Sequence, residues 1–429
     1  MNFVLRAGYE GAAQLARTLA LVAPAGQNKI LDSLASRRGL ISRYRAFRRD
    51  AAQPLLWMHA PSVGEGLQAR PVLELMRQRL PGTQLAYTWF SPSARDFAAR
   101  LDVDFRDVLP FDDTPDMRSA IRALSPSAIV FSKLDVWPTM AREAARQHVK
   151  LGLISATLAR GSSRRGRIAR AILREAYGRL DRVGAISIED ADRLIALGVP
   201  ARRISVTGDA RYDQVWERAA SVDRTSALLA PLVSDRPTLV AGSTWPADEA
   251  ALLEAWAALR SKEPSARLII APHEPRPHHL APIDAWAAAT GLTAARLGSD
   301  GAPGADVVVV DRVGVLGDLY ALADVAFVGG GFHAAGLHSV LEPAAFGVPV
   351  VFGPAFAASR DATLLLDADA AISVASAVEL QTVLAGWLFD SGKRSRAAGA
   401  AAREVVVRGL GAAERSFDLV RSLLRGAAR

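Results

Sequence analysis

The stretch DVAFVGGGFHAAGLHSVLEPAAFGVPVVFGP, from Asp324 to Pro354, predicts a buried strand, a glycine turn, a helix start and a second buried strand. Val325–Val328 is apolar enough for an inner strand of a parallel sheet. Gly329–Gly331 allow backbone to approach a ligand closely, because glycine has no Cβ. His338–Glu342 then reaches a helix start, where N–H groups favour anions and a carboxylate can accept from two sugar hydroxyls. We therefore expect this unit to hold the nucleotide of an activated sugar.

Apolar runs alternate with helical segments along most of the chain, on both sides of one break. The runs before the break are LLWMH (55–59), QLAYTWF (84–90), SAIVFS (127–132), KLGLIS (150–155) and RVGAIS (182–187). Those after it are TLVAGS (238–243), RLIIAP (267–272), DVVVVD (306–311), DVAFVG (324–329) and VPVVFG (348–353). Two such series predict an α/β protein with two Rossmann-like, doubly wound parallel-sheet domains. Ligands bind outside the carboxyl ends of such strands, so we expect the site in the cleft between the domains.

The length of 429 residues also suggests two domains rather than one. We divide the chain into an N-terminal interfacial and basic segment (1–50), an N-terminal Rossmann-like domain (51–222) and a C-terminal Rossmann-like domain with terminal helices (223–429). The chain has no cysteine, which excludes disulfides, thiolate metal sites and cysteine nucleophiles.

The formal charge of +8 indicates an anionic partner: a phosphorylated substrate, an acidic lipid surface or nucleic acid. The arginines gather in two clusters, which are Arg37, Arg38, Arg43, Arg45, Arg48 and Arg49, and Arg160, Arg164, Arg165, Arg167, Arg170 and Arg174. Neither cluster is interleaved with aromatic residues that stack on bases, and no nucleic-acid motif accompanies them, so we expect no nucleic-acid partner. A solvated charged surface is the alternative.

The N-terminal segment has no apolar run of the roughly 20 residues that cross a bilayer, and no signal-peptide cleavage site. Leu15, Leu19 and Val22 fall on one helical face. An interfacial helix on an acidic membrane and an ordinary helix packed on the domain are both compatible with this pattern.

The first candidate for chemistry is WMHAPSVGEG, residues 57–66. Glu65 follows a strand and opens a helix, and the positive helix end keeps such a carboxylate ionised, which suits a general base. The alternative is a capping box, because Ser62 and Glu65 have the S-x-x-E spacing. Ser339 and Glu342 have the same spacing and the same alternative.

Two further segments of the first domain carry charged candidates. Asp135, in KLDVWP, can polarise a substrate group or orient a base, or it can simply start the following helix. Arg211, in VTGDARYD, can bind a leaving phosphate with two N–H groups, or it can form a surface ion pair with Asp209 or Asp213.

The second domain adds Ser243 after a strand and a group of histidines at 273, 278 and 279. No carboxylate completes a metal-binding set with these histidines, so we expect no metal. The chain lacks a G-x-x-x-x-G-K-[ST] loop and a G-x-S-x-G elbow, which argues against P-loop and α/β-hydrolase chemistry.

Five ordered motifs together resemble the bacterial Kdo transferases of lipopolysaccharide assembly, which are GT-B glycosyltransferases. The motifs are HAPSVGEG (59–66), LDVWP (134–138), VTGDARYD (206–213), AGST (241–244) and GLHSVLEPAAFGVPVVFGP (336–354). The resemblance spans about residues 55 to 408. It implies an inverting transfer of 3-deoxy-D-manno-oct-2-ulosonic acid (Kdo) from CMP-Kdo to a lipid A precursor, without a metal or other cofactor.

The resemblance also implies residue roles. The family's general base falls on Glu65. The family's acidic residue and its lysine, which act around the charge that develops during the transfer, fall on Asp135 and Arg211. The CMP contacts fall on Pro272, His273, Val313, Gly314, Val315, Ser339, Val340, Leu341 and Glu342, and we add Ser243 and His338 from the adjoining turns. Departures from the family pattern stand at Pro61, Lys133, Asp209, Arg211, His273, Val315, Ser339 and Val340.

The partners that follow from the resemblance are a CMP-sugar, a phosphorylated lipid A-type acceptor and the inner membrane surface. The protein is accordingly expected on the cytoplasmic face of the bacterial inner membrane, bound peripherally or by its N-terminal helix. Two alternatives stay open: a GT-B enzyme that uses another nucleotide sugar, and a non-catalytic GT-B module that binds a nucleotide.

Overall fold

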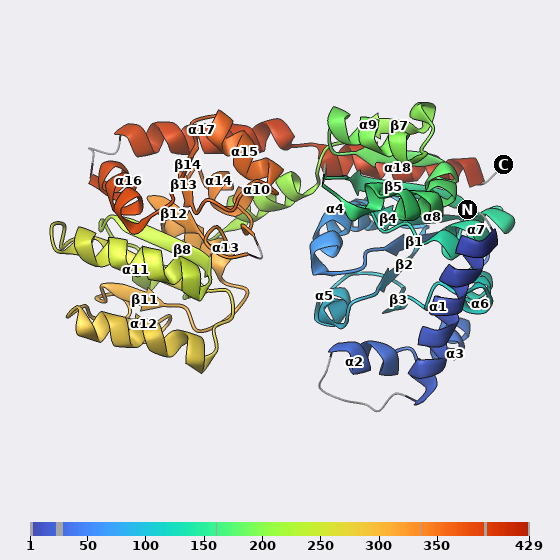
Figure 1. Ribbon diagram of the computed structural model, residues 1–429, viewed down its shortest axis with the longest axis horizontal. Coiled ribbons are helices and arrows are strands. Elements are labelled where there is room, and N and C mark those ends of the chain that lie inside the picture. Colours follow the sequence, from blue (N-terminus) through green and yellow to red (C-terminus); the bar gives the residue numbers. More distant parts are fainter. Residues whose placement is uncertain (1–2, 23–28, 160, 335, 390–392, 428–429) are drawn as a thin grey trace. The chain divides into compact units, whose positions relative to one another are not determined.

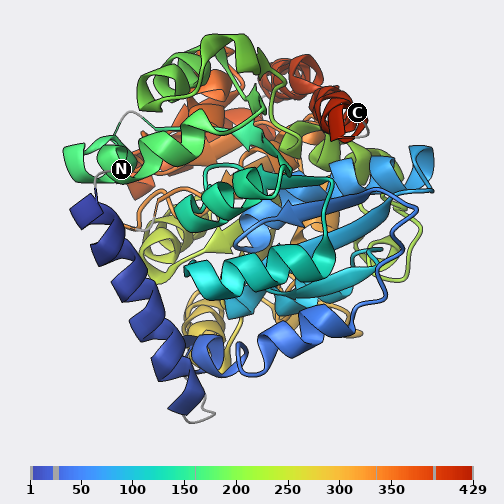
Figure 2. The ribbon, with the colours of Figure 1, turned by 90° about the vertical axis from the view of Figure 1, so that its right-hand side faces the viewer.

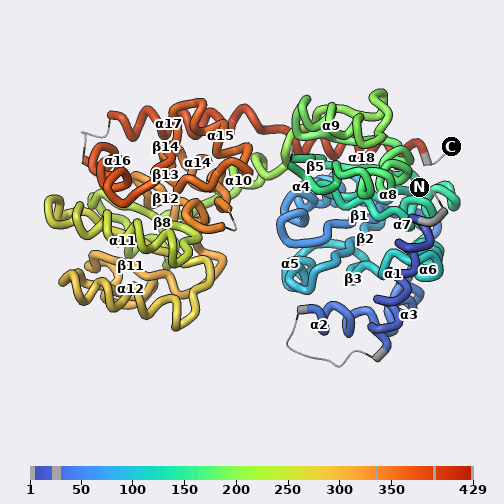
Figure 3. Tube along the Cα trace, viewed as in Figure 1, coloured from blue at the N-terminus to red at the C-terminus, as the bar shows by residue number. Residues whose placement is uncertain are grey.

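The computed structural model describes residues 3–22, 29–159, 161–334, 336–389 and 393–427, and its chain forms two compact α/β units (Figures 1 and 3). Unit 1 comprises Met1–Asp213 and Leu410–Arg429, and unit 2 comprises Gln214–Gly409. Each unit is built on one parallel sheet of seven strands.

The sheet of unit 1 has the order β3-β2-β1-β4-β5-β6-β7. Its strands are β1 (Leu55–His59), β2 (Gln84–Trp89), β3 (Phe105–Val108), β4 (Ala128–Ser132), β5 (Lys150–Ala156), β6 (Arg182–Ala185) and β7 (Ile204–Val206). Its helices are α1 (Phe3–Val22), α2 (Lys29–Ala35), α3 (Leu40–Ala46), α4 (Val63–Arg79), α5 (Arg95–Ala99), α6 (Thr114–Leu124), α7 (Pro138–Arg146), α8 (Arg167–Gly178), α9 (Ile188–Leu197) and α18 (Ala412–Ala427). The strand order reverses between β1 and β4, and ligands bind at such a switch point in this class of sheet.

The sheet of unit 2 has the order β10-β11-β9-β8-β12-β13-β14, with its switch between β8 and β12. Its strands are β8 (Thr238–Thr244), β9 (Arg267–Pro272), β10 (Ala294–Arg296), β11 (Val307–Val309), β12 (Val325–Val328), β13 (Val350–Phe352) and β14 (Ala371–Ser373). Its helices are α11 (Pro246–Arg260), α12 (Pro277–Ala289), α13 (Leu316–Leu319), α14 (Leu341–Ala345), α15 (Arg360–Asp367), α16 (Ala377–Phe389) and α17 (Lys393–Gly409). Helix α10 (Arg211–Ser221) runs across the boundary between the units.

Successive residues of the unit 2 strands point into two different apolar cores. Leu239 and Ala241 join the core that contains Trp256 of α11, whereas Val240 joins the core that contains Tyr320. Both faces of the sheet are therefore buried, which explains why these strands read as continuous apolar runs.

The ten predicted apolar runs all contain strands of these two sheets, so the predicted α/β class is confirmed. The ten runs do not include β3, β7, β10 and β14. These four are the short edge strands of the two sheets, with the sequences FRDV, ISV, AAR and AIS, and an edge strand does not need apolar side chains on both faces.

The compact units differ from the sequence-based division in three ways. The boundary lies between Asp213 and Gln214 rather than between residues 222 and 223, residues 410–429 belong to unit 1 rather than to the C-terminal domain, and the N-terminal segment is part of unit 1. Phe417, Val420 and Leu423 of α18 are buried in the core of unit 1. A Cβ at Gly152 of β5 would lie 2.6 Å from a methyl carbon of Leu423, so glycine at this position lets α18 approach the sheet closely. Glycine breaks between α17 and α18 allow the chain to return, and Asp213 accepts hydrogen bonds from the Gly411 and Ala413 amides at 2.6 and 2.8 Å.

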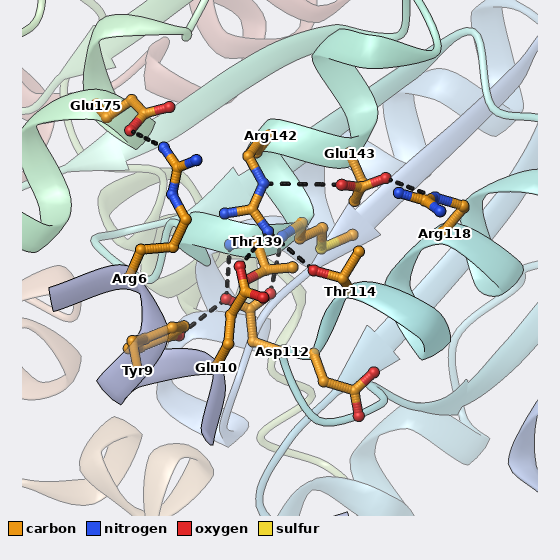
Figure 4. Close-up of polar contacts among 12 residues, drawn as sticks. Arg6, Tyr9, Glu10, Asp112, Thr114, Arg118, Thr139, Arg142, Glu143 and Glu175 are labelled. Carbon is orange, nitrogen blue, oxygen red and sulfur yellow. Dashed lines mark hydrogen bonds and ion pairs between the residues drawn. The ribbon is translucent and has the colours of Figure 1, made fainter. Parts of the chain in front are cut away.

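Helix α1 contacts unit 1 through its polar side (Figure 4). The Tyr9 hydroxyl donates to the Asp112 carboxylate at 2.8 Å, and Arg142 donates to Glu10 at 2.7 Å. Arg6 donates to Glu175 of α8 at 3.2 Å. These contacts come from α6–α8 and their loops, so the N-terminal helix is held by several neighbouring elements.

The opposite side of α1 is apolar and exposed. Leu15 and Leu19 are 62% and 48% exposed, and Figure 2 shows α1 along the outside of the unit. The side chain of Val22, predicted on the same face, lies outside the described residues, as does Arg160 of the second basic cluster. The contacts of the polar side show that α1 packs on its domain, whereas membrane binding by the apolar side stays a prediction. Within the described residues, no helix has the length and apolarity that a membrane crossing requires.

Arg37 does not belong to the basic surface that the sequence predicted. It is buried, donates to the carbonyl oxygens of Leu109 and Phe90, and lies 4.2 Å over the Phe90 ring. Its guanidinium joins α2 and α3 to the loops after β2 and β3, because a planar group with five donors can bridge several carbonyls.

Candidate active site

The carboxyl ends of β1 and β4 carry the first group of candidate residues. Glu65 lies in the first turn of α4, directly after the β1 loop, and Lys133 and Asp135 follow β4. Gly66 is required beside Glu65, because a Cβ there would lie 2.4 Å from the Phe97 ring and 2.8 Å from the Tyr87 hydroxyl. Two of the predicted catalytic residues therefore lie at the switch point of the first sheet.

The Glu65 carboxylate is held by two donors. One oxygen accepts from the Ser62 hydroxyl, and the other accepts from Lys133 Nζ at 3.1 Å. Burial raises the pKa of Glu65, but the Ser62 hydrogen bond and the Lys133 charge outweigh it, and the pKa is lowered overall. Glu65 is thus ionised at neutral pH, as a proton acceptor must be.

The capping-box alternative at Ser62 and Glu65 is not formed. Ser62 is the N-cap of α4, but its hydroxyl contacts the Glu65 side chain instead of the helix backbone. The Ser339 and Glu342 pair forms no box either, because α14 begins only at Leu341 and its N-cap is Val340.

Lys133 was noted in the sequence only as a departure from the family pattern, and its pairing with Glu65 was not predicted. Lys133 adopts a left-handed backbone conformation with φ of 68°. Its neighbour Asp135 pairs with Arg164 of the second basic cluster, and burial raises the pKa of Asp135. Positive and negative groups therefore alternate in this cluster: Glu65, Lys133, Asp135 and Arg164.

His59, which ends β1, has a structural role. Its Nε2 accepts from the Trp137 indole at 3.0 Å, so its Nδ1 carries the proton and donates to Thr88 Oγ1 at 3.0 Å. Burial lowers the pKa of His59 to about 3, which keeps the ring neutral.

Arg211 pairs with Asp209 at 2.7 Å. An ion pair with Asp209 or Asp213 was the predicted alternative to phosphate binding by Arg211. Asp209 also accepts from Gln68 Nε2 at 3.1 Å, and Gln68 lies on the same helix as Glu65. Arg211 is thereby connected to the helix that carries Glu65.

The glycine turn after β12 packs against the protein's own backbone. A Cβ at Gly329 would lie 2.3 Å from the Ser243 carbonyl oxygen, and one at Gly331 would lie 2.3 Å from the Gly353 amide. Gly330 has φ of 89° and lies against Gly336 in the same way. These glycines therefore allow the end of β8 and the loops after β12 and β13 to approach each other closely, and the ligand contact predicted for them stays a prediction.

Arg218 of α10 holds the predicted nucleotide segment 313–315, and this contact was not predicted. It donates to the Gly314 carbonyl at 3.2 Å and to Asp318 at 3.0 Å. The neighbouring Val313 is 77% exposed, and Gly314 has φ of 90°. The 313–315 turn is thus an exposed loop that is held by the hydrogen bond from Arg218 to the Gly314 carbonyl.

The Glu342 carboxylate lies in the first turn of α14. Burial raises its pKa, the positive charge of Arg218 lowers it, and the negative charge of Asp318 raises it further. Among the described residues no hydrogen bond satisfies this carboxylate. It therefore retains the capacity to accept from the two hydroxyls of a ribose.

An aromatic group lies where β8, β9 and β12 end. The Trp245 indole donates to His338 Nε2 at 3.0 Å, and its ring centre lies 4.7 Å from those of His273 and His333. Burial and the neighbouring His273 and His333 lower the pKa of His338 to about 4. His273 and His338 were predicted site residues, whereas Trp245 and His333 were not.

The other predicted contacts adjoin this group. Ser243 has φ of 54° and is the penultimate residue of β8, while Pro272 ends β9 next to His273. His278 and His279 contact each other on α12, away from the stack, with ring centres 4.2 Å apart. Across the described ranges, no three histidine, aspartate or glutamate side chains are arranged to hold a metal ion.

Known proteins resemble the chain over most of its length. The profile of the family described as 3-deoxy-D-manno-octulosonic-acid transferase (kdotransferase) matches residues 32–214. The 3-deoxy-D-manno-octulosonic acid transferase of Bordetella pertussis is 31% identical over 382 residues, which are 86% of this chain and 87% of that relative. The enzyme of the same name from Haemophilus influenzae is 26% identical over 396 residues, covering 90% and 92%.

A solved structure of UDP-N-acetylglucosamine 2-epimerase from Neisseria meningitidis, bound to UDP-GlcNAc, has a TM-score of 0.60 to this chain at 13% identity. It covers 83% of this chain and 99% of the epimerase. A likeness at that identity concerns the fold alone, and it confirms the predicted GT-B class with two Rossmann-like units.

Proposed function

Because the chain belongs to the 3-deoxy-D-manno-octulosonic acid transferase family, we propose that it transfers Kdo from CMP-Kdo to a lipid A precursor, as a step of lipopolysaccharide synthesis. The observation that carries the proposal is the ionised Glu65 carboxylate at the switch point of the first sheet. Each of its oxygens accepts one hydrogen bond and has room for another, so Glu65 can still accept a proton from a substrate.

In the proposed reaction, Glu65 takes the proton of an acceptor hydroxyl while the hydroxyl oxygen bonds to the anomeric carbon of Kdo. The bond from that carbon to the CMP phosphate breaks, and CMP leaves from the opposite side with the bonding electron pair, so the configuration inverts. Lys133 and Ser62 hold the carboxylate in place, and Asp135 holds Arg164 nearby. Preorganised charges of this kind are effective because they need not reorganise during the reaction.

Residues of unit 2 would bind the CMP part of the donor. Glu342 is suited to the ribose hydroxyls, and the exposed backbone of the 313–315 turn to the base. His338 Nδ1–H is a donor for the phosphate, because its Nε2 is occupied by Trp245. We include no metal, since cationic side chains and N–H donors can stabilise the leaving phosphate, and we expect EDTA to leave turnover unchanged.

We also propose that the protein binds the cytoplasmic face of the inner membrane through α1 and α8. Leu15 and Leu19 project from α1, and Ile168 of α8 is 69% exposed beside Arg167 and Arg170. Apolar side chains next to arginines suit a surface of anionic lipids, and the same arginines suit the phosphates of the acceptor.

The test of the transfer is incubation with CMP-Kdo and a lipid A precursor, followed by mass spectrometry of the lipid. We expect Kdo addition by the wild type and a roughly 10²–10⁴-fold slower rate for Glu65→Gln. Glu74→Gln is the matched control, since Glu74 lies on the same helix and pairs with Arg70 at the surface. A Glu65→Gln variant with near-normal turnover would refute the role of Glu65, and absence of any Kdo product would refute the reaction.

The membrane proposal is tested by sedimentation with vesicles containing anionic phospholipid. We expect the double variant Leu15→Ser/Leu19→Ser to bind less than wild type. Val233→Ser is the control, because Val233 is 53% exposed and lies in unit 2. Equal binding by all three proteins would remove α1 from the membrane-binding surface.

A further inference from the structure

Four aromatic side chains from three separate loops form one continuous stack in unit 2. Trp245 follows β8, His273 follows β9, and His333 and His338 follow β12. The planes of Trp245 and His333 are 9° apart, and the rings of His273 and His338 lie 4.4 Å apart at 27°. Three imidazoles thus converge on one indole at the switch point of the second sheet.

One hydrogen bond decides where a proton can be placed in this stack. The Trp245 indole N–H donates to His338 Nε2 at 3.0 Å. A protonated His338 has no acceptor nitrogen, so it would lose this bond and turn two N–H groups toward each other. His338 therefore stays neutral, and any added proton belongs on His273 or His333.

The short distance between the His273 and His338 rings also limits how many imidazoles of the stack can be protonated at once. Two positive charges on rings 4.4 Å apart repel each other strongly, so His273 and His338 are not both protonated. A single imidazolium on His273 is tolerated, because it stacks on the electron-rich face of Trp245. An arriving anion would favour that charged form further by a charge-assisted hydrogen bond.

The carboxylates near the stack already have partners. Asp248 of α11 is buried and accepts from the amides of Trp245, Gly330 and Phe332 at 2.7 to 2.9 Å. Glu249 accepts from the Thr244 hydroxyl, and Glu274 lies 3.8 Å from Arg276. The charged and titratable groups of the surrounding elements are Asp248, Glu249, Glu274, Arg276, His278, His279, His333 and His338.

We propose that Trp245, His273, His333 and His338 form the binding site for the phosphate of the donor, and that His273 takes up one proton when the phosphate binds. This inference rests on the proposed function, since it concerns how the same CMP donor is held. His273 is the acceptor of the proton because it is exposed, contacts Trp245 and His338, and lies at a predicted CMP contact. Trp245 and His333 become positioning residues that hold the ring of His273 and favour its charge.

The experiment is calorimetric titration of the full chain with CMP at pH 7.5 in two buffers of different ionisation enthalpy, which gives the number of protons taken up. We expect net uptake by the wild type, and a Kd for CMP that rises with pH by up to about tenfold per unit. His273→Gln should abolish the uptake and weaken binding roughly tenfold. His278→Gln is the matched control, because His278 is exposed but lies outside the stack. Cytidine, which lacks the phosphate, should cause no uptake.

Each alternative result has a separate meaning. CMP binding without proton uptake, or uptake that persists in His273→Gln, overturns the inference and leaves the proposed transfer intact. Absence of CMP binding by a folded wild-type protein overturns both. Trp245→Phe adds a further check, since it removes the bond to His338 and should allow His338 to take up the proton in the absence of CMP.

Discussion

Replacing Asp112 by Asn should change how the stability of unit 1 depends on pH. The Asp112 carboxylate is buried between α1 and α7, where it accepts from the Thr139 and Met140 amides and from the Tyr9 hydroxyl, each at 2.8 Å (Figure 4). Burial raises the pKa of Asp112 from 3.8 to about 6, although these three donors and Arg142 oppose the increase.

The sign follows from proton linkage. Between pH 4 and 6 the folded protein holds a proton on Asp112 that the unfolded chain has lost, so the free energy of unfolding decreases as the pH rises through this window. From pH 5 to pH 8 the decrease attributable to this group is roughly 1.4 kcal/mol, since one pKa unit corresponds to about 1.36 kcal/mol. Asn at this position does not titrate. The free energy of unfolding of the wild type minus that of Asp112→Asn should therefore decrease by about this amount from pH 5 to pH 8.

The assay is urea unfolding at several pH values with hydrogen-exchange mass spectrometry, which reports the peptides of α1 and α7 separately from unit 2. Tyr9→Phe is the matched variant: it keeps the carboxylate and removes one donor, so it should keep the pH dependence and make it steeper. The raised pKa of Asp112 would be refuted if the difference in free energy of unfolding between the wild type and Asp112→Asn stayed constant or grew with pH.

Three other changes should have distinct effects. Lys133→Met removes the charge that lowers the pKa of Glu65, so the acid side of the kcat/KM profile should move to higher pH while the rate at pH 8 stays near wild type; an unmoved profile contradicts the pairing. Gly152→Ala should lower the free energy of unfolding by about 1–3 kcal/mol in urea titrations, and the additional change Leu423→Ala should recover part of the loss. Arg218→Met should raise the KM for CMP-Kdo and leave kcat unchanged, because it loosens the 313–315 turn; a lower kcat with constant KM would argue for a different role.

The inner strands could be predicted from the sequence because both of their faces are buried. The core of unit 2 takes successive residues such as Leu239 and Val240 on opposite sides, which leaves an apolar run as a signal. The edge strands β3, β7, β10 and β14 carry no such signal. The return of α18 to unit 1 was also not visible, because an amphipathic helix does not specify which of two sheets it covers.

Site residues that belong to a short sequence motif could be predicted, whereas partners that come from distant parts of the chain were missed. Glu65 and Glu342 follow recognisable strand-turn-helix patterns. Their partners Lys133 and Arg218 come from other parts of the chain, and the pairing of two distant charges leaves no spacing to detect. His333 was overlooked for a similar reason, since its stacking partner Trp245 lies 88 positions earlier in the chain.

The return of α18 to the first sheet sets an order for biosynthesis. A ribosome completes all of unit 2 before it makes Phe417, Val420 and Leu423, which cover part of the unit 1 core. Unit 2 can therefore fold while the apolar face around Gly152 of β5 is still uncovered, and that face is exposed to chaperones and to aggregation during this interval. Unit 1, although it is synthesised first, is the last to be completed.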